Sequence, residues 1–524
     1  MGCPRRLRAN IAAAMETARS TSWDRRTAAW LAAVAALAYL PFNHCHFTST
    51  DETGVFDPAL SLYTRGTLAV EPGMHIFAGR DGRFYSHFAI GQTFLALPFI
   101  AVGDAFARAL GPERVRAAIG RDDEDTIDTH ESPEIFFTSA YAPIATGVLL
   151  AIFFLFERGL GVSLRSALCA SALLGACTYV AAQSVYFLQH TSEAIAILGG
   201  VAALFAWRRT GRVAWLATGT ALASSVVIVR VPAAVSGPAL AGYLAFSLVA
   251  RAREAGLPAG KVAAAIALPS AAVAAVYVAT NLAKWGTWIS SPMTAQSFLL
   301  HGSLRSGLFG LLFSPGAGLF AYSPLLVLLP FWLPSFWRAH RAETLAIFAV
   351  VASFLLLCGR FVFWHGLWSA PGPRYLFALV PLLMLPLGAW LDRPKPRWQR
   401  GLAGGLAALG FATQLALITA RWQRTVARMG YEPELTVASQ RFLFEPLRAP
   451  IAGQLRSLFA GDVDAYLWTL WFGVPGRAPQ RALAFALLCA WALALAYCGW
   501  RLRASIATSA EPLANSAANP GSGR

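Results

Sequence analysis

The chain has 524 residues, of which 56% are hydrophobic and only 13% are charged. Soluble domains carry about 25% charged residues, and so much apolar surface could not be hidden from water in one or two cores. The composition excludes a soluble multidomain enzyme and a disordered chain, and it indicates a membrane protein with many spans. The net charge of +16 comes from basic clusters between apolar runs, which is typical of membrane topology and not of nucleic-acid binding.

Twelve apolar runs have about the length that a membrane-crossing helix needs. The first covers residues 27–43 and lacks a small-residue cleavage site, so we expect a retained anchor and not a removed signal. We predict an all-α polytopic membrane protein with about 12 transmembrane helices, within a range of 11–13. The other runs lie near residues 134–156, 166–186, 190–207, 213–230, 232–250, 262–283, 322–337, 343–362, 374–391, 401–420 and 481–500.

One further apolar stretch, residues 86–107, is interrupted by Gly91, Pro98 and Gly103. If it crossed the membrane, every later loop would change sides and the arginine-rich loops would face outward, against the positive-inside rule. We therefore predict that it lies along the membrane surface or re-enters it. The inside loops are then the short basic ones at residues 157–165, 208–212, 251–261, 338–342 and 392–400.

This topology divides the chain into seven segments. The inside loops are too short to hold a catalytic domain, so we expect chemistry on the outer face or within the membrane. The segments are a cytoplasmic N-terminus (1–26), a first span (27–43), an external loop with surface helices (44–133), a transmembrane core (134–420), a second external loop (421–480), a last span (481–500) and a disordered cytoplasmic tail (501–524).

Two adjacent carboxylates, Asp51 and Glu52, follow the first span directly. A carboxylate held near an apolar lipid surface has a raised pKa and can accept a proton from an attacking hydroxyl. The alternative is a solvated pair that caps the helix-like stretch at residues 58–68. A metal held by His44 and His46 with Asp51 is a further alternative, which we do not favour because interfacial histidines need no metal.

The acidic pair, the short helix and residues 84–92 (FYSHFAIGQ) together resemble the GT-C superfamily of membrane glycosyltransferases. Within it, the likeness is to the protein O-mannosyltransferase and aminoarabinose-transferase group. The resemblance implies a GT-C-like fold, an inverting transfer of sugar from a polyprenyl-phosphate donor, and Asp51 as the catalytic carboxylate with Glu52 beside it. His87 is then an expected substrate contact. Members often carry a Lys-Pro or His-Pro pair there, whereas this chain has Phe88 after His87.

Two arginines are candidates for the donor phosphate, because the arginine fork pairs well with phosphate oxygens. Arg230 is an isolated charge in an apolar run, which favours a functional part, although an arginine that reaches the headgroups is the alternative. Arg374 and Tyr375 end a turn broken by Gly and Pro at the head of a span, where an aromatic belt is the alternative. We expect Arg230, Arg374 and Tyr375 to bind the donor phosphate.

His190 and Glu193 open a span three residues apart and share a helical face. They either contact the substrate or form a pair with each other. The acidic run at residues 121–128 reads as a solvated loop, with divalent-cation binding as the alternative. We expect no required cofactor, and whether a divalent cation takes part stays open.

The sequence therefore predicts an enzyme, a hexosyl- or pentosyltransferase with a lipid-linked donor. Its location is the cell membrane, and its arginine- and alanine-rich composition favours a bacterial inner membrane. The predicted topology places the active site on the outer face. The expected partners are a polyprenyl-phosphate-linked sugar, membrane lipids and a glycan, lipid or protein acceptor, without nucleic acid. The alternative is a transporter or flippase of a lipid-linked or small polar substrate, which would show broken spans in matching halves.

Overall fold

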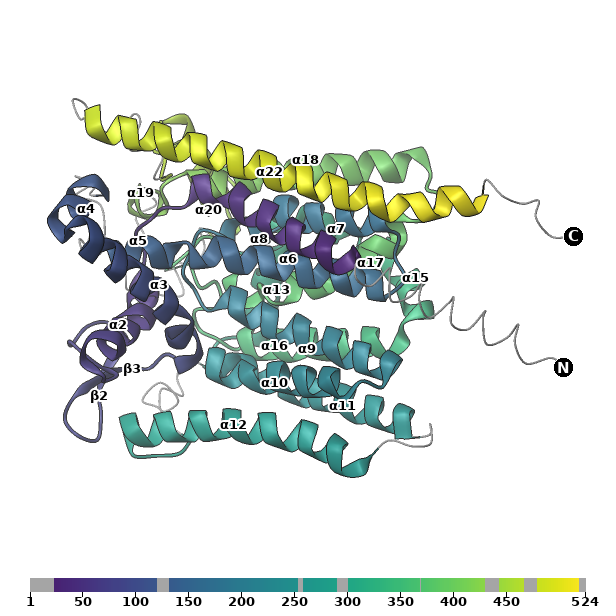
Figure 1. The fold of residues 1–524 in the computed structure, drawn as a ribbon, viewed down its shortest axis with the longest axis horizontal. Helices are drawn as coiled ribbons and strands as arrows, with labels where there is room; N and C mark the ends of the chain where they lie inside the picture. Colours follow the sequence, from purple (N-terminus) through teal and green to yellow (C-terminus); the bar gives the residue numbers. More distant parts are fainter. Residues whose placement is uncertain are drawn as a thin grey trace, which may run out of the picture.

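The computed structural model describes residues 23–119, 132–252, 258–289, 300–367, 369–428, 443–465 and 478–517. Within this part of the chain, helices run side by side and form an elongated bundle (Figure 1). Eight of the described helices are long and apolar enough to cross a membrane, and four shorter apolar helices of 10–17 residues accompany them. The predicted class, an all-α polytopic membrane protein, is confirmed.

The bundle helices follow the predicted apolar runs, beginning with a helix over residues 23–39 that ends in η1 (Leu40–Phe42). The others are α6 (Tyr141–Gly159), α7 (Leu164–Cys177), α9 (His190–Thr210), α10 (Val213–Val229), α11 (Gly237–Ala252), α12 (Ala259–Trp285), α15 (Leu329–Ala339), α16 (Arg341–Cys358), α17 (Leu379–Leu391), α18 (Arg397–Thr419) and α22 (Ala478–Ala517). Shorter pieces connect them, namely α5 (Pro133–Ser139), α8 (Val180–Gln183), η2 (Val231–Ser236), α13 (Leu304–Phe313), α14 (Leu319–Tyr322), η4 (Pro324–Leu328), η5 (Arg374–Leu376), α19 (Trp422–Arg428) and α20 (Pro450–Phe459).

The first long loop combines helices with a small sheet at the left end of the bundle in Figure 1. Its sheet was not predicted; the strands pair antiparallel in the order β1-β3-β2, with Tyr85 opposite both Ala69 and Phe77. The first helix of the loop starts at Thr50, ahead of the predicted residue 58, because the acidic pair favours a helical first turn. The elements are α2 (Thr50–Arg65), β1 (Ala69–Val70), β2 (Ile76–Ala78), β3 (Phe84–Ser86), α3 (Ile90–Leu110) and α4 (Pro112–Ile119).

The helix α3 corresponds to the stretch predicted to lie along or re-enter the membrane. It packs against α2, α4, α5 and α10. By length and composition alone it also belongs to the eight helices that could cross a membrane. Its position along the surface therefore stays a prediction.

The predicted inside loops meet at the end of the bundle opposite the first loop, which we call the basic end. Arg158 in the last turn of α6 lies 2.9 Å from Asp24 in the first helix, measured from Nε to Oδ1. Arg208 at the end of α9 pairs with Glu343 at the start of α16. We call the opposite end the loop end, because α2 and the sheet lie there; it also holds the start of α9 and the ends of α10 and α12.

The last helix, α22, packs against the first. The indole Nε1 of Trp491 donates a hydrogen bond to the Leu37 carbonyl (2.6 Å), and the hydroxyls of Thr27 and Ser505 lie 2.7 Å apart. The prediction that residues 501–524 form a disordered tail is wrong as far as Ala517, because alanine and arginine favour helix and α22 continues through them. The acidic run at residues 121–128 lies outside the described residues.

Candidate active site

Asp51 is the meeting point of three segments that are far apart in the sequence. It lies in the first turn of α2, with 13% of its side chain exposed. Its Oδ2 accepts hydrogen bonds from the Ser369 hydroxyl (2.6 Å) and from Nη1 of Arg374. Its Oδ1 lies 3.1 Å from Nε2 of His75, which the loop between β1 and β2 provides. Both carboxylate oxygens of Asp51 therefore have partners.

These partners decide the ionisation of Asp51. Burial alone would raise the pKa of its carboxyl, but the Arg374 guanidinium and the hydrogen bonds from His75 and Ser369 outweigh burial and hold that pKa well below its usual range. Burial likewise opposes the charged form of Arg374, yet Asp51 and Tyr375 prevail and raise the pKa of the guanidinium. The expectation of a raised pKa for Asp51 is wrong, because the sequence does not reveal which groups surround it.

Further predicted residues continue from Arg374 in a row. The guanidinium carbons of Arg374 and Arg230 each lie 5.2 Å from the centre of the Tyr375 ring, within cation–π distance. Nη1 of Arg230 lies 3.2 Å from Oε2 of Glu193. We call Asp51, Arg374, Tyr375, Arg230 and Glu193 the central row. A carboxylate stands at each end, a guanidinium comes next to each carboxylate, and both cations contact the same aromatic ring.

Local backbone structure places these side chains. Arg230 is the extended C-cap of α10, which ends here because Pro232 lacks the N–H that a continuing helix would need. Gly366 has a φ of +62°, and a Cβ there would lie 2.9 Å from Nε of Arg374 and 3.0 Å from the Tyr375 ring. Only glycine therefore lets this loop pass so close to the row.

His190 joins the row at its far end. Its Nδ1 lies 3.5 Å from Oε2 of Glu193, and its ring centre lies 6.4 Å from that of Tyr375. Both residues belong to the first turn of α9 and are buried. The two side chains therefore pair with each other and also lie beside the row, so the two alternatives for this pair do not exclude each other.

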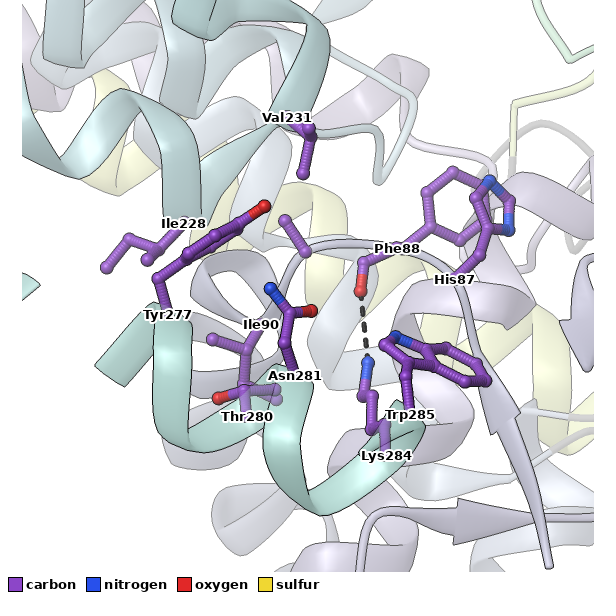
Figure 2. Close-up of a pocket in the computed structure, with 11 residues that line it drawn as sticks. His87, Phe88, Ile90, Ile228, Val231, Tyr277, Thr280, Asn281, Lys284 and Trp285 are labelled. Atoms are coloured by element: carbon purple, nitrogen blue, oxygen red, sulfur yellow. Dashed lines mark hydrogen bonds between the residues drawn. The ribbon is translucent and has the colours of Figure 1, made fainter. Parts of the chain in front are cut away.

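His87 lines a pocket between α3, α10 and α12 (Figure 2). Its Nδ1 lies 3.0 Å from the carbonyl oxygen of His75, and burial lowers the pKa of the His87 imidazole to about 4. Lys284, at the end of α12, donates hydrogen bonds from Nζ to the carbonyls of Ser86 (2.8 Å) and Phe88 (3.2 Å). The segment around His87 is therefore held from two sides.

Glu52 faces away from the central row. It is buried, and its carboxylate accepts hydrogen bonds from Thr48 N (2.7 Å), Thr48 Oγ1 (2.9 Å), Ser49 Oγ (3.2 Å) and Phe187 N (2.7 Å). Burial raises the pKa of the Glu52 carboxyl in spite of these bonds. Glu52 is thus not the solvated cap of the alternative: it is buried in the first turn of α2 and binds the residues that precede this helix, whereas Asp51 beside it belongs to the row.

Possible metal ligands are not gathered in the described part of the chain, where no group of three His, Cys, Asp or Glu residues is arranged to hold an ion. His46 places its Nε2 3.0 Å from Oδ1 of Asp464, and its ring centre lies 5.8 Å from that of His44. Asp51 contacts His75, Ser369 and Arg374 instead of these two histidines. A part for a divalent cation stays a prediction that the structure does not test.

Three residues of this region were not predicted: His75, Ser369 and Lys284. Lys284 could have been singled out from the sequence, because it is one of three lysines in the chain and it ends an apolar run. Ser369 lies within the turn that was singled out for Arg374. His75 carried no signal, since its position follows from a left-handed backbone with a φ of +66°.

Fold and site together define an all-α polytopic membrane protein with a buried row of paired charges at the loop end of its bundle. No protein-family model and no curated protein matches the chain. Among solved structures, it is similar to ArnT from Cupriavidus metallidurans. The crystal structure bound to undecaprenyl phosphate is 13% identical, with a TM-score of 0.44 over 84% of this chain and 75% of that one. The apo structure is 14% identical, with a TM-score of 0.44 over 87% and 77%.

Proposed function

We propose that the protein is an inverting glycosyltransferase that moves a sugar from a polyprenyl-phosphate donor to an acceptor on the outer face of the membrane. The observation that carries this proposal is the central row, in which two buried guanidinium groups flank one ring. The positive-inside rule supports the orientation, because the basic end would face the cytoplasm and the loop end would face outward.

The two guanidinium groups suit a phosphate headgroup. Both arginines are less than a tenth exposed, and carboxylates at the two ends of the row balance their charge. Nε of Arg374 is buried and makes no hydrogen bond to another described residue. Charge that develops on a departing phosphate would be stabilised by such preorganised donors more strongly than in water.

The surroundings of the row suit the apolar tail of the donor. The pocket beside His87 lies between the ends of α10 and α12 (Figure 2). Along α12 most apolar side chains are exposed, as is expected of a helix that faces lipid. A prenyl chain could therefore lie against α12 in the bilayer while its phosphate reaches Arg230 and Arg374.

The reaction needs a group that accepts a proton on the side of Asp51. The acceptor oxygen attacks the anomeric carbon from the face opposite the phosphate. The bond from that carbon to the phosphate oxygen breaks, and its electron pair leaves with the polyprenyl phosphate. The proton of the acceptor hydroxyl passes to the enzyme next to Asp51, whose negative charge favours that transfer. The configuration at the anomeric carbon is inverted.

The test combines a deletion strain with a reconstituted assay. Mass spectrometry of lipid-linked sugars and envelope glycans in the deletion strain identifies the accumulating donor and the missing product. The purified protein is then assayed in proteoliposomes with that donor. We expect Asp51→Asn to lower turnover at least about 100-fold, whereas Glu71→Gln, a carboxylate in the same loop whose side chain is 89% exposed, leaves it unchanged. Carrier movement across the bilayer without sugar transfer would contradict the proposal and support a flippase.

A further inference from the structure

We infer that His75 is the residue that takes the proton of the acceptor hydroxyl, with Asp51 as the carboxylate that orients it. This inference rests on the proposed glycosyl transfer. The two residues form a dyad through Nε2 of His75 and Oδ1 of Asp51, which lie 3.1 Å apart.

Accessibility distinguishes the two members of the dyad. The Asp51 side chain is 13% exposed, and Oδ2 is occupied by Ser369 and Arg374. The His75 side chain is 30% exposed. Its Nδ1 makes no hydrogen bond to any other residue that the structure describes. An incoming hydroxyl therefore meets the imidazole of His75 and not the carboxylate of Asp51.

The backbone of His75 is held in a conformation that side chains rarely adopt. Its φ is +66°, and among the described residues only Cys45 shares a positive φ without being glycine. The carbonyl of His75 accepts a hydrogen bond from the backbone N–H of His87 (3.2 Å) and also lies 3.0 Å from Nδ1 of that residue. Strained residues of this kind concentrate at functional sites, where the surrounding structure enforces them. Here the enforced conformation brings the imidazole to Asp51.

The proton path follows from the contact. Nε2–H of His75 donates to Asp51, so the lone pair of the ring is on Nδ1. The hydroxyl proton moves to Nδ1 while the acceptor oxygen bonds to the anomeric carbon and the sugar–phosphate bond breaks toward phosphate. The resulting imidazolium lies against the ionised Asp51 carboxylate, which stabilises it. Because the ring is partly exposed, the proton then passes to water.

Other charged groups around His75 do not replace it in this step. His87 packs beside it with ring centres 5.3 Å apart, and because burial lowers the pKa of His87 to about 4, that ring stays neutral above pH 5. Lys284 reaches the same segment from α12 but donates to backbone carbonyls. Arg374 remains a cation on the far side of Asp51.

The test measures kcat and KM for two variants in proteoliposomes with the identified donor. His75→Asn tolerates a positive φ and can still donate to Asp51, and His75→Gly adopts that φ without strain. We expect both to lower kcat by about 10²–10⁴-fold with little change in KM. Added imidazole should restore part of the activity of His75→Gly. Met74→Leu, at the neighbouring position whose residue is 66% exposed, should behave as the wild type.

Other outcomes would overturn the inference. A variant that keeps a third of the wild-type turnover shows that another group takes the proton, and the proposed function then stands with Asp51 as the base. A large loss of turnover that does not respond to added imidazole in His75→Gly shows that His75 only shapes the loop. Absence of turnover in the wild type with every carrier-linked sugar contradicts the proposed function itself, and this inference with it.

Discussion

Arg230 and Arg374 stand over the ring of the same tyrosine, each with its guanidinium carbon 5.2 Å from the ring centre. The first arginine ends α10 and the second begins η5, so two distant segments place like charges next to each other. Burying two cations in this way requires counter-charges, which Glu193 and Asp51 provide from opposite sides. The two ion pairs therefore explain how two cations can be buried side by side, and in the proposed function these cations bind the donor phosphate.

The fork of Arg374 should matter more than its charge. Arg374→Lys keeps a cation but cannot contact Asp51 and a phosphate with two parallel N–H groups. We expect kcat to fall by about 10–100-fold, equivalent to about 1.4–2.7 kcal/mol of lost transition-state stabilisation. Arg360→Lys, an exposed arginine at the end of α16, is the matched control and should leave turnover intact. Equal losses in both variants would contradict a specific part for Arg374.

The Arg230–Glu193 pair should show strong coupling in unfolding experiments. Removing one partner leaves a buried charge without its counter-charge, which costs about 3–5 kcal/mol. We therefore expect Arg230→Gln and Glu193→Gln each to lower the melting temperature in detergent, and the double variant to be less destabilised than the sum of the two. Simple additivity of the three melting-temperature shifts would show that the two residues act independently.

Gly366→Ala should disturb the site although it replaces no charged residue. The added Cβ would lie 2.9 Å from Nε of Arg374, at a position whose φ is already left-handed. We expect turnover to fall at least about tenfold, because small misplacements of catalytic groups have large effects on rate. Gly401→Ala on α18, where a Cβ meets open space, should have wild-type activity. Undiminished turnover in Gly366→Ala would mean that the loop can move aside without loss.

Glu52→Gln should affect stability more than chemistry. The substitution weakens an acceptor of four hydrogen bonds that joins the start of α2 to the segment before α9. We expect a loss of about 1–3 kcal/mol in stability, seen as a lower melting temperature, with kcat/KM within about threefold of the wild type. A loss of turnover as large as that of Asp51→Asn, at unchanged melting temperature, would instead give Glu52 a direct part in catalysis.

His365 should make stability depend on pH. Burial, assisted by the charge of Arg374, lowers the pKa of this imidazole to about 3, whereas it is about 6.5 in an unfolded chain. The unfolded state therefore binds more protons between these values. The stabilisation is complete above pH 6.5 and is lost as the pH falls toward 3. We expect the melting temperature of His365→Asn to fall less than that of the wild type between pH 7 and pH 4.5; parallel curves would contradict this.

Much of the bundle could be predicted because apolar length and arginine-rich ends are local properties of the sequence. The charged residues of the site were also visible, since an isolated Arg230 or an Asp51 beside a span stands out against an apolar background. Their pairing was not visible, because Asp51 and Arg374 are 323 positions apart. The direction of the Asp51 pKa shift depends on that pairing, and the place of His75 depends on a single backbone angle.

The contact between the first helix and α22 has a consequence for how the protein is made. The loop that carries Asp51 follows the first helix directly, whereas Trp491 and Ser505, which contact that helix, are synthesised at least 454 positions after the residues they contact. The contacts between the first helix and α22 can therefore form only after α22 has been synthesised. A chain that stops before residue 478 would thus contain every residue of the central row but would lack the contacts between the first helix and α22.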